Sequence, residues 1–171
     1  MESHNHELKD RIATYLSHLY ENKMNEYLNI IVLDQFLWTA TVVNNDNDVV
    51  KYKGQPYWSK KAIIHYQSIN IKNKQKDFSG LRHEHIMPRK LIKEKILASN
   101  KSKEVILEIL NKYSHAVIIT KEEDQILKDM GFNQSMPESF NQTEEILDRY
   151  DGSGIEIIDV RNTNLKEIKF H

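Results

Sequence analysis

The chain has 171 residues, enough for one domain with a buried core, and its 39% apolar and 29% charged residues are typical of globular proteins. It contains no cysteine, which excludes disulfides and thiolate zinc sites. No apolar run is long enough for a membrane span, and the first residues lack the pattern of a signal peptide, so we expect a cytoplasmic protein.

The net charge of −1 conceals an uneven distribution along the chain. Residues 1–50 carry 3 basic and 8 acidic side chains, residues 51–103 carry 14 and 3, and residues 104–171 carry 7 and 14. A basic block in an otherwise acidic protein indicates a polyanionic partner, most often nucleic acid. The alternative is a solvated lysine-rich surface that the acidic flanks balance after folding.

The first 70 residues are expected to form a helical region. Apolar residues at steps of three and four predict a helix over 4–22. A second helix is predicted from about 25 to 41, although the segment 39–43 would also suit a strand. A polar loop follows at 44–48, and Ser59 is a candidate N-cap for a helix that ends between 66 and 69.

The middle of the chain changes from strand to helix twice. A lysine-rich segment over 70–80 ends in a turn, and a short strand is predicted over 81–86. Helices are expected at 89–98 and 103–112, followed by an apolar, β-branched strand at 115–119.

The next helix, over 121–130, has clear end signals. Thr120 is its expected N-cap, Glu123 its capping-box partner, and Gly131 its end. A short helix over 143–149 and a strand over 155–160 complete the chain. These elements predict an α+β fold, mostly helical and compact, with regions at 1–70, 71–150 and a strand-like tail at 151–171.

The tripeptide His83-Glu84-His85 is the strongest chemical signal in the sequence. It places a carboxylate, which suits a hard cation, beside an imidazole, which suits deprotonation of water. Side chains of consecutive strand residues point to opposite faces, so the pair serves one reaction only where the strand bends or stops. Pro88 predicts such a stop, because proline suits the first turn of a helix.

The run Glu84-His85-Ile86-Met87-Pro88 resembles the first strand end of the HNH, or ββα-metal, nucleases, and the likeness covers about residues 80–130. It implies a strand pair followed by a helix around one divalent cation, with a helical insertion between the strands. Glu84 would bind the metal and His85 would be the general base. Asp124 or Glu123 would supply a further ligand. His115 stands where the family has its middle asparagine, and Asp124 where it has its last histidine.

The resemblance implies a metal-dependent nuclease. Two carboxylates favour Mg²⁺ or Mn²⁺ over zinc. The nucleic acid, DNA ahead of RNA, would be held by basic residues near the dyad; these are Arg82, Arg89, Lys90 and Lys93. His83 would at most support the site, with its side chain facing away from that of Glu84.

Structural interpretations compete with each of these roles. His83 and His85 would also suit the surface of an edge strand, and His115 a strand end bonded to backbone. The acids at 122–124 would also stabilise a helix N-terminus, while Trp38 and Trp58 are expected in the core. The main functional alternative is a non-catalytic protein on an HNH-like core that binds nucleic acid, or a protein partner in a phage or defence system.

Overall fold

The structure is a computed structural model, and it describes residues 5–22, 26–43, 48–52, 54–69 and 78–170. Most of the predicted polar loop (44–47) and of the lysine-rich segment (70–77) lies outside these ranges. The described helices are α1 (His6–Glu21), α2 (Glu26–Val42), α3 (Lys60–Ser68), α4 (Arg89–Ala98), α5 (Lys103–Tyr113), α6 (Lys121–Asp129), α7 (Phe140–Thr143) and α8 (Asp148–Asp151). The described strands are β1 (Tyr57–Ser59), β2 (Leu81–His85), β3 (Ala116–Thr120) and β4 (Ile157–Asp159).

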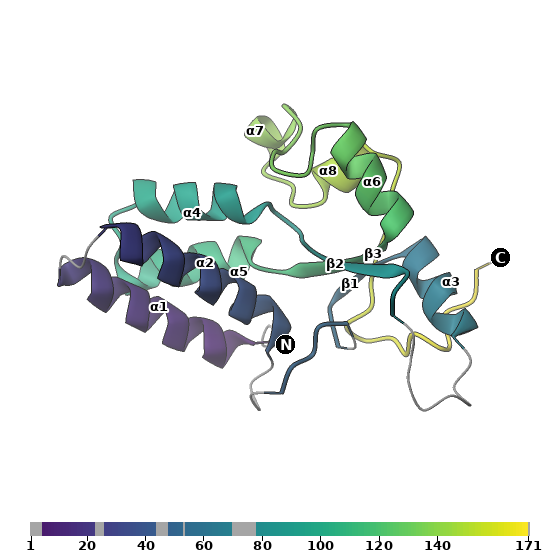
Figure 1. Ribbon diagram of the computed structural model, residues 1–171, viewed down its shortest axis with the longest axis horizontal. Coiled ribbons are helices and arrows are strands. Elements are labelled where there is room, and N and C mark those ends of the chain that lie inside the picture. The colour runs from purple at the N-terminus through teal and green to yellow at the C-terminus, as the bar shows by residue number, and fades with distance from the viewer. Residues whose placement is uncertain (1–4, 23–25, 44–47, 53, 70–77, 171) are drawn as a thin grey trace. The chain divides into compact units, whose positions relative to one another are not determined.

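These elements confirm the predicted α+β class, with eight described helices and a small mixed sheet (Figure 1). None of the described helices is long and apolar enough to cross a membrane.

The chain divides into two compact units, each built from two separate segments. Unit 1 comprises Met1–Lys51 and His85–His115, and unit 2 comprises Tyr52–Glu84 and Ala116–His171. The units therefore differ from the three consecutive regions expected from the sequence, because each unit combines segments that are distant along the chain.

Unit 1 is an arrangement of four helices. Helix α1 packs against α2 and α5, and α4 packs against the same two helices (Figure 1). The helices share an apolar interior to which each contributes fully buried side chains, among them Leu16, Leu37, Ile92 and Leu110. One charged side chain, Lys9 of α1, also lies inside this unit and is only 1% exposed.

Unit 2 is built on the sheet, whose strand order is β2-β3-β1-β4. Strand β3 lies in the interior of the sheet, and all five of its residues are buried, as its β-branched sequence predicts. Strand β1 pairs parallel with β3, where Trp58 faces Ile118, and antiparallel with β4, where Trp58 faces Ile158. Helix α3 packs against β3 and β1, and Trp58, Ile63 and Tyr66 belong to one apolar cluster that also includes Ile118 of β3.

Strands β2 and β3 are neighbours that run in opposite directions. The backbone N–H of Lys121 donates to the carbonyl of Gly80, and that of Ile86 donates to the carbonyl of His115. As the residue number rises from 80 to 86 along β2, the number of the bonded residue on the β3 side falls from 121 to 115. This is the antiparallel pattern. Since α4 and α5 lie between the strands in sequence and α6 follows β3, the order of the predicted ββα element and its helical insertion is present.

Two local predictions were wrong. Strand β1 was not predicted, because its three residues are too few to show alternation. It also expected one short helix over 143–149, whereas the structure has the four-residue helices α7 and α8 on either side of Glu144. Glu144 has a positive φ of 50°, which ends α7 and prevents a continuous helix.

Candidate functional site: a buried charge cluster in unit 2

Glu84, the predicted metal ligand, lies near the end of β2 and faces a buried arginine from α8. The guanidinium Nη2 of Arg149 is 3.4 Å from Oε2 of Glu84. The Glu84 side chain is 30% exposed and that of Arg149 is fully buried. A buried guanidinium needs several acceptors to replace its hydration. Arg149 also donates to the carbonyl of Phe132 over 2.9 Å and to the hydroxyl of Tyr150 over 2.7 Å.

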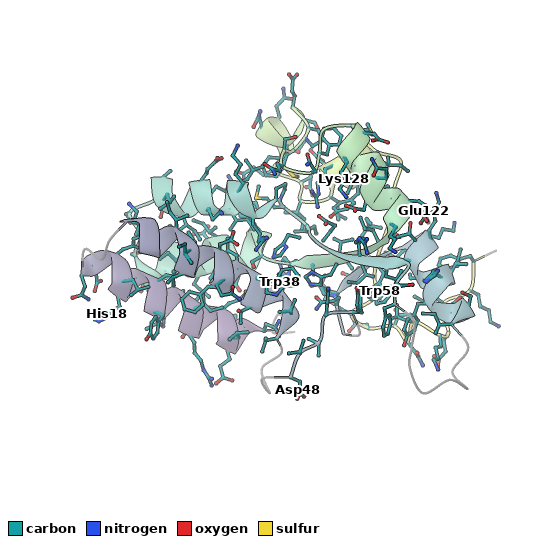
Figure 2. The ribbon with its side chains drawn as sticks, viewed as in Figure 1. His18, Trp38, Asp48, Trp58, Glu122 and Lys128 are labelled. Atoms are coloured by element: carbon teal, nitrogen blue, oxygen red, sulfur yellow. The ribbon has the colours of Figure 1, made fainter. Side chains whose placement is uncertain are left out.

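Asp124 provides the second carboxylate, from the first turn of α6, and it too has cationic partners. Nζ of Lys128, one helical turn further on, lies 2.6 Å from Oδ2 of Asp124. Nε of Arg82 on β2 lies 3.8 Å from the same oxygen. The Asp124 side chain is 12% exposed, whereas those of Lys128 and Arg82 are 48% and 44% exposed. Figure 2 shows Lys128 on α6.

Burial and neighbouring charges shift the pKa of two groups in the cluster, Glu84 and Tyr150. Burial raises the pKa of Glu84, the charge of Arg149 opposes this rise, and the negative charge of Asp124 adds to it. Burial likewise raises the pKa of Tyr150 to about 12, despite the neighbouring Arg149. The two predicted metal carboxylates therefore lie close enough for their charges to influence each other.

Glu123, the alternative metal ligand, has a structural position. Its carboxylate accepts from the Thr120 backbone N–H over 2.9 Å, and the Thr120 hydroxyl accepts from the Glu123 N–H, so the predicted capping box is confirmed. The hydroxyl of Ser59 also donates to the Glu123 carboxylate, over 2.5 Å. The Ser59 hydroxyl in turn accepts from the N–H of Ala62 at the start of α3, as its predicted N-cap role requires.

His85, the predicted general base, belongs to unit 1 and is buried there. Its Nε2 lies 3.2 Å from the carbonyl of Leu37 and 3.2 Å from the hydroxyl of Thr41, both on α2. Its ring is 5.8 Å from that of Trp38. Successive strand side chains point to opposite faces. Glu84 and His85, though adjacent in sequence, thus make their contacts with different helices.

The other two histidines of the predicted site, His83 and His115, lie on or beside the strands β2 and β3. His83 is buried, and the alternation of strand side chains assigns it to the face of β2 that carries His85. His115 precedes β3, and its Nε2 lies 2.7 Å from the carbonyl of Asn111. This is the backbone bond that the structural interpretation of His115 predicted.

The described residues do not fit a resident divalent cation in the arrangement they adopt. Within the described ranges, no group of three or more histidine, aspartate or glutamate side chains converges on one point. The two carboxylates that the resemblance assigns to the metal already have protein cations as partners, Glu84 with Arg149 and Asp124 with Lys128. A hard cation needs oxygen ligands that are available to it.

The predicted nucleic-acid-binding residues fall into both units. Arg82 lies in unit 2, beside Asp124, whereas Arg89, Lys90 and Lys93 lie on α4 of unit 1. Arg89 and Lys93 form ion pairs of 2.8 and 2.9 Å with Asp34 of α2. Burial alone would raise the pKa of the Asp34 carboxyl. The hydrogen bond from Lys93 and the charge of Arg89 outweigh burial and lower this pKa.

Two features of the sites were not predicted from the sequence: the partial exposure of Trp38 and the role of Arg149. Trp38 was expected in the core but is only partly buried, with Nζ of Lys51 and Cζ of Arg89 at 5.9 and 5.7 Å from its ring centre. Trp58, by contrast, is fully buried as expected; Figure 2 labels both tryptophans. Arg149 was not considered, although it is the one basic residue between Phe132 and Arg161.

Comparison with protein-family models, with curated proteins and with solved structures finds no match.

Proposed function

We propose that the protein binds nucleic acid through a basic, aromatic surface of unit 1. This Trp38 surface consists of Trp38, Lys51, Arg89, Lys90 and Lys93. The observation that carries the proposal is the placing of two cations, Lys51 and Arg89, within 6 Å of a partly exposed indole ring.

The charge of the Trp38 surface suits phosphate. Asp34 pairs with both Arg89 and Lys93, so one carboxylate faces two cations, and Glu94 lies 4.0 Å from Lys90. The Lys90 side chain is 62% exposed and Lys51 is exposed, so both are accessible to a polyanion. Phosphate contacts by such residues provide affinity without reading sequence.

The indole ring favours nucleic acid with unpaired bases over an uninterrupted duplex. Aromatic rings beside cations are the usual platform for unstacked bases, because every base has a face that can stack. A duplex presents its phosphates but keeps its base faces covered. We therefore expect a single strand, or a duplex with a single-stranded end, to bind more tightly than a blunt duplex.

The first test measures binding by fluorescence anisotropy as a function of salt. The double variant Lys51→Glu/Lys90→Glu should weaken binding of a single-stranded oligonucleotide at least about tenfold. It should also reduce the slope of log affinity against log salt by about 2, since each lost phosphate contact reduces the slope by about 1. The control Arg11→Glu/Lys61→Glu changes the net charge equally on exposed side chains outside the Trp38 surface. Equal losses in both double variants would contradict a localised surface.

A second readout uses the two tryptophans as reporters. Trp58 is fully buried in unit 2, so Trp38 should be responsible for any quenching of fluorescence by bound nucleic acid. Trp38→Leu should abolish the quenching and weaken binding, whereas Trp58→Phe should keep both. Quenching that persists in Trp38→Leu would remove the ring from the interface.

Metal-dependent hydrolysis is the second candidate; it would require a divalent ion to displace the cations that pair with Glu84 and Asp124, and one specific observation favours it. Strands β2 and β3 run antiparallel and precede α6, and burial, with the charge of Asp124 on α6 adding to it, raises the pKa of Glu84 on β2. A nuclease would nick DNA or RNA with Mg²⁺ or Mn²⁺. Glu84→Gln should then abolish cutting, because it removes a carboxylate that would bind the ion. A protein that binds nucleic acid but cuts none with either metal ion would support the non-catalytic binding function.

A further inference from the structure

We propose that Arg149 is a resident cation of unit 2. Its guanidinium holds Glu84 where the resemblance to ββα-metal nucleases implies a divalent ion, and unit 2 consequently takes up no such ion. The inference concerns the charge cluster alone and does not depend on nucleic-acid binding by unit 1.

Each of the two acids in the cluster faces a cation of its own. Glu84 faces Arg149 at 3.4 Å, and Asp124 faces Lys128 at 2.6 Å. A divalent ion bound by both carboxylates would have to displace both partners. Lys128 is half exposed and free to move into solvent, but the Arg149 side chain has no exposed surface. Arg149 is therefore the cation that blocks the site.

Arg149 is also held in place by acceptors other than Glu84. One guanidinium nitrogen donates to the Phe132 carbonyl, and the other donates to the Tyr150 hydroxyl. Tyr150 is itself fully buried. A planar guanidinium group with several acceptors keeps one orientation. The positive charge thus stays beside Glu84 whether or not Asp124 is engaged.

This role differs from that of an ordinary structural ion pair in one measurable respect. Any buried pair is destabilised when one partner is removed. If Arg149 takes the place of a metal, its removal also leaves Glu84 and Asp124 as neighbouring carboxylates without a buried counter-charge, the ligand type that Mn²⁺ and Mg²⁺ prefer. Neutralising Arg149 should therefore create affinity for a divalent ion.

The experiment titrates Mn²⁺ into the full-length, chelator-treated protein and follows free Mn²⁺ by electron paramagnetic resonance. Wild type should bind no Mn²⁺ below about 1 mM, and its melting temperature should not change with Mn²⁺. Arg149→Gln should melt lower but bind one Mn²⁺ at least about tenfold more tightly than wild type, with its melting temperature restored in part. Adding Glu84→Gln to this variant should remove the new site.

Two further variants complete the test. Lys128→Gln removes the exposed cation of the cluster and should not create a site. Arg149→Lys keeps the charge and serves if Arg149→Gln fails to fold; it too should bind no Mn²⁺. One Mn²⁺ bound by wild type and lost in Glu84→Gln would overturn the proposal, as would a folded Arg149→Gln protein that binds none. No nucleic acid is present, so the outcome is independent of the function proposed for unit 1.

Discussion

At the scale of single residues, Lys9 gives unit 1 a defined pH dependence. The side chain is 1% exposed, its Nζ has no hydrogen-bond partner among the described residues, and burial lowers its pKa from 10.5 to about 7. Between these two values the unfolded chain binds more protons than the folded protein. The free energy of unfolding should therefore rise from about pH 7 to about pH 10, by up to about 1.4 kcal/mol per pH unit. The gain is lost as the pH falls towards 7.

Urea unfolding at several pH values between about 7 and 9.5 measures this slope. Lys9→Met should flatten it and should be more stable than wild type at neutral pH, because the buried ammonium is gone. Lys90→Met, on a 62% exposed side chain, should keep the wild-type slope. An unchanged slope in Lys9→Met would show that the amine is solvated in the folded protein.

The residues of the candidate site were partly predictable. Glu84 and Asp124 were identified from the strand end and the helix start that carry them, since both signals are local. The partner of Glu84 was not predicted, because Arg149 lies 65 positions further along the chain. The contacts of His85 with Leu37 and Thr41 likewise span 48 and 44 positions. Local patterns identify reactive side chains but not what neutralises them.

At the scale of elements, the Glu123 carboxylate stabilises the start of α6, because it accepts hydrogen bonds from both Thr120 and Ser59. Thr120→Ala should lower the free energy of unfolding by about 1 kcal/mol, the usual effect of losing an N-cap. Glu123→Ala should lower it by about 2–4 kcal/mol, because the Ser59 hydroxyl and the Thr120 N–H both lose a buried acceptor. Gln125→Ala, on the exposed side of α6, should stay within about 0.5 kcal/mol of wild type.

Chemical denaturation with and without Mn²⁺ measures these differences. We expect the loss in Glu123→Ala to be the same under both conditions, because its carboxylate is used for capping. A loss that grew when Mn²⁺ was present would instead restore Glu123 as a metal ligand.

Helices with end signals were the most predictable elements. Ser59, Thr120 and Gly131 marked true boundaries, because capping bonds and the positive φ of Gly131, 78°, depend on neighbouring residues. Strand β1 depends instead on Ile118 and Ile158, its partners from distant segments. Such pairing leaves no local pattern in three residues.

At the scale of the whole molecule, each unit has its own apolar interior. Leu37→Ala in unit 1 and Ile63→Ala in unit 2 both truncate fully buried side chains and should each cost about 2–5 kcal/mol. We expect hydrogen exchange to quicken mainly over 5–51 and 85–115 in the first variant, and mainly over 52–84 and 116–170 in the second. Uniform acceleration along the chain in both variants would show that the units unfold as one.

The discontinuity of unit 1 also has a consequence for synthesis on the ribosome. Helices α1 and α2 leave the ribosome first, but α4 and α5, which complete their shared interior, end only near residue 113. At about 5–20 residues per second, the chain from 51 to 115 takes roughly 3–13 s to make. Throughout this interval the buried face of α2, including Leu33, Leu37 and Ala40, lacks its final cover. The nascent protein should therefore need a holding chaperone over this interval, and synonymous codons that slow translation between 52 and 84 should increase aggregation.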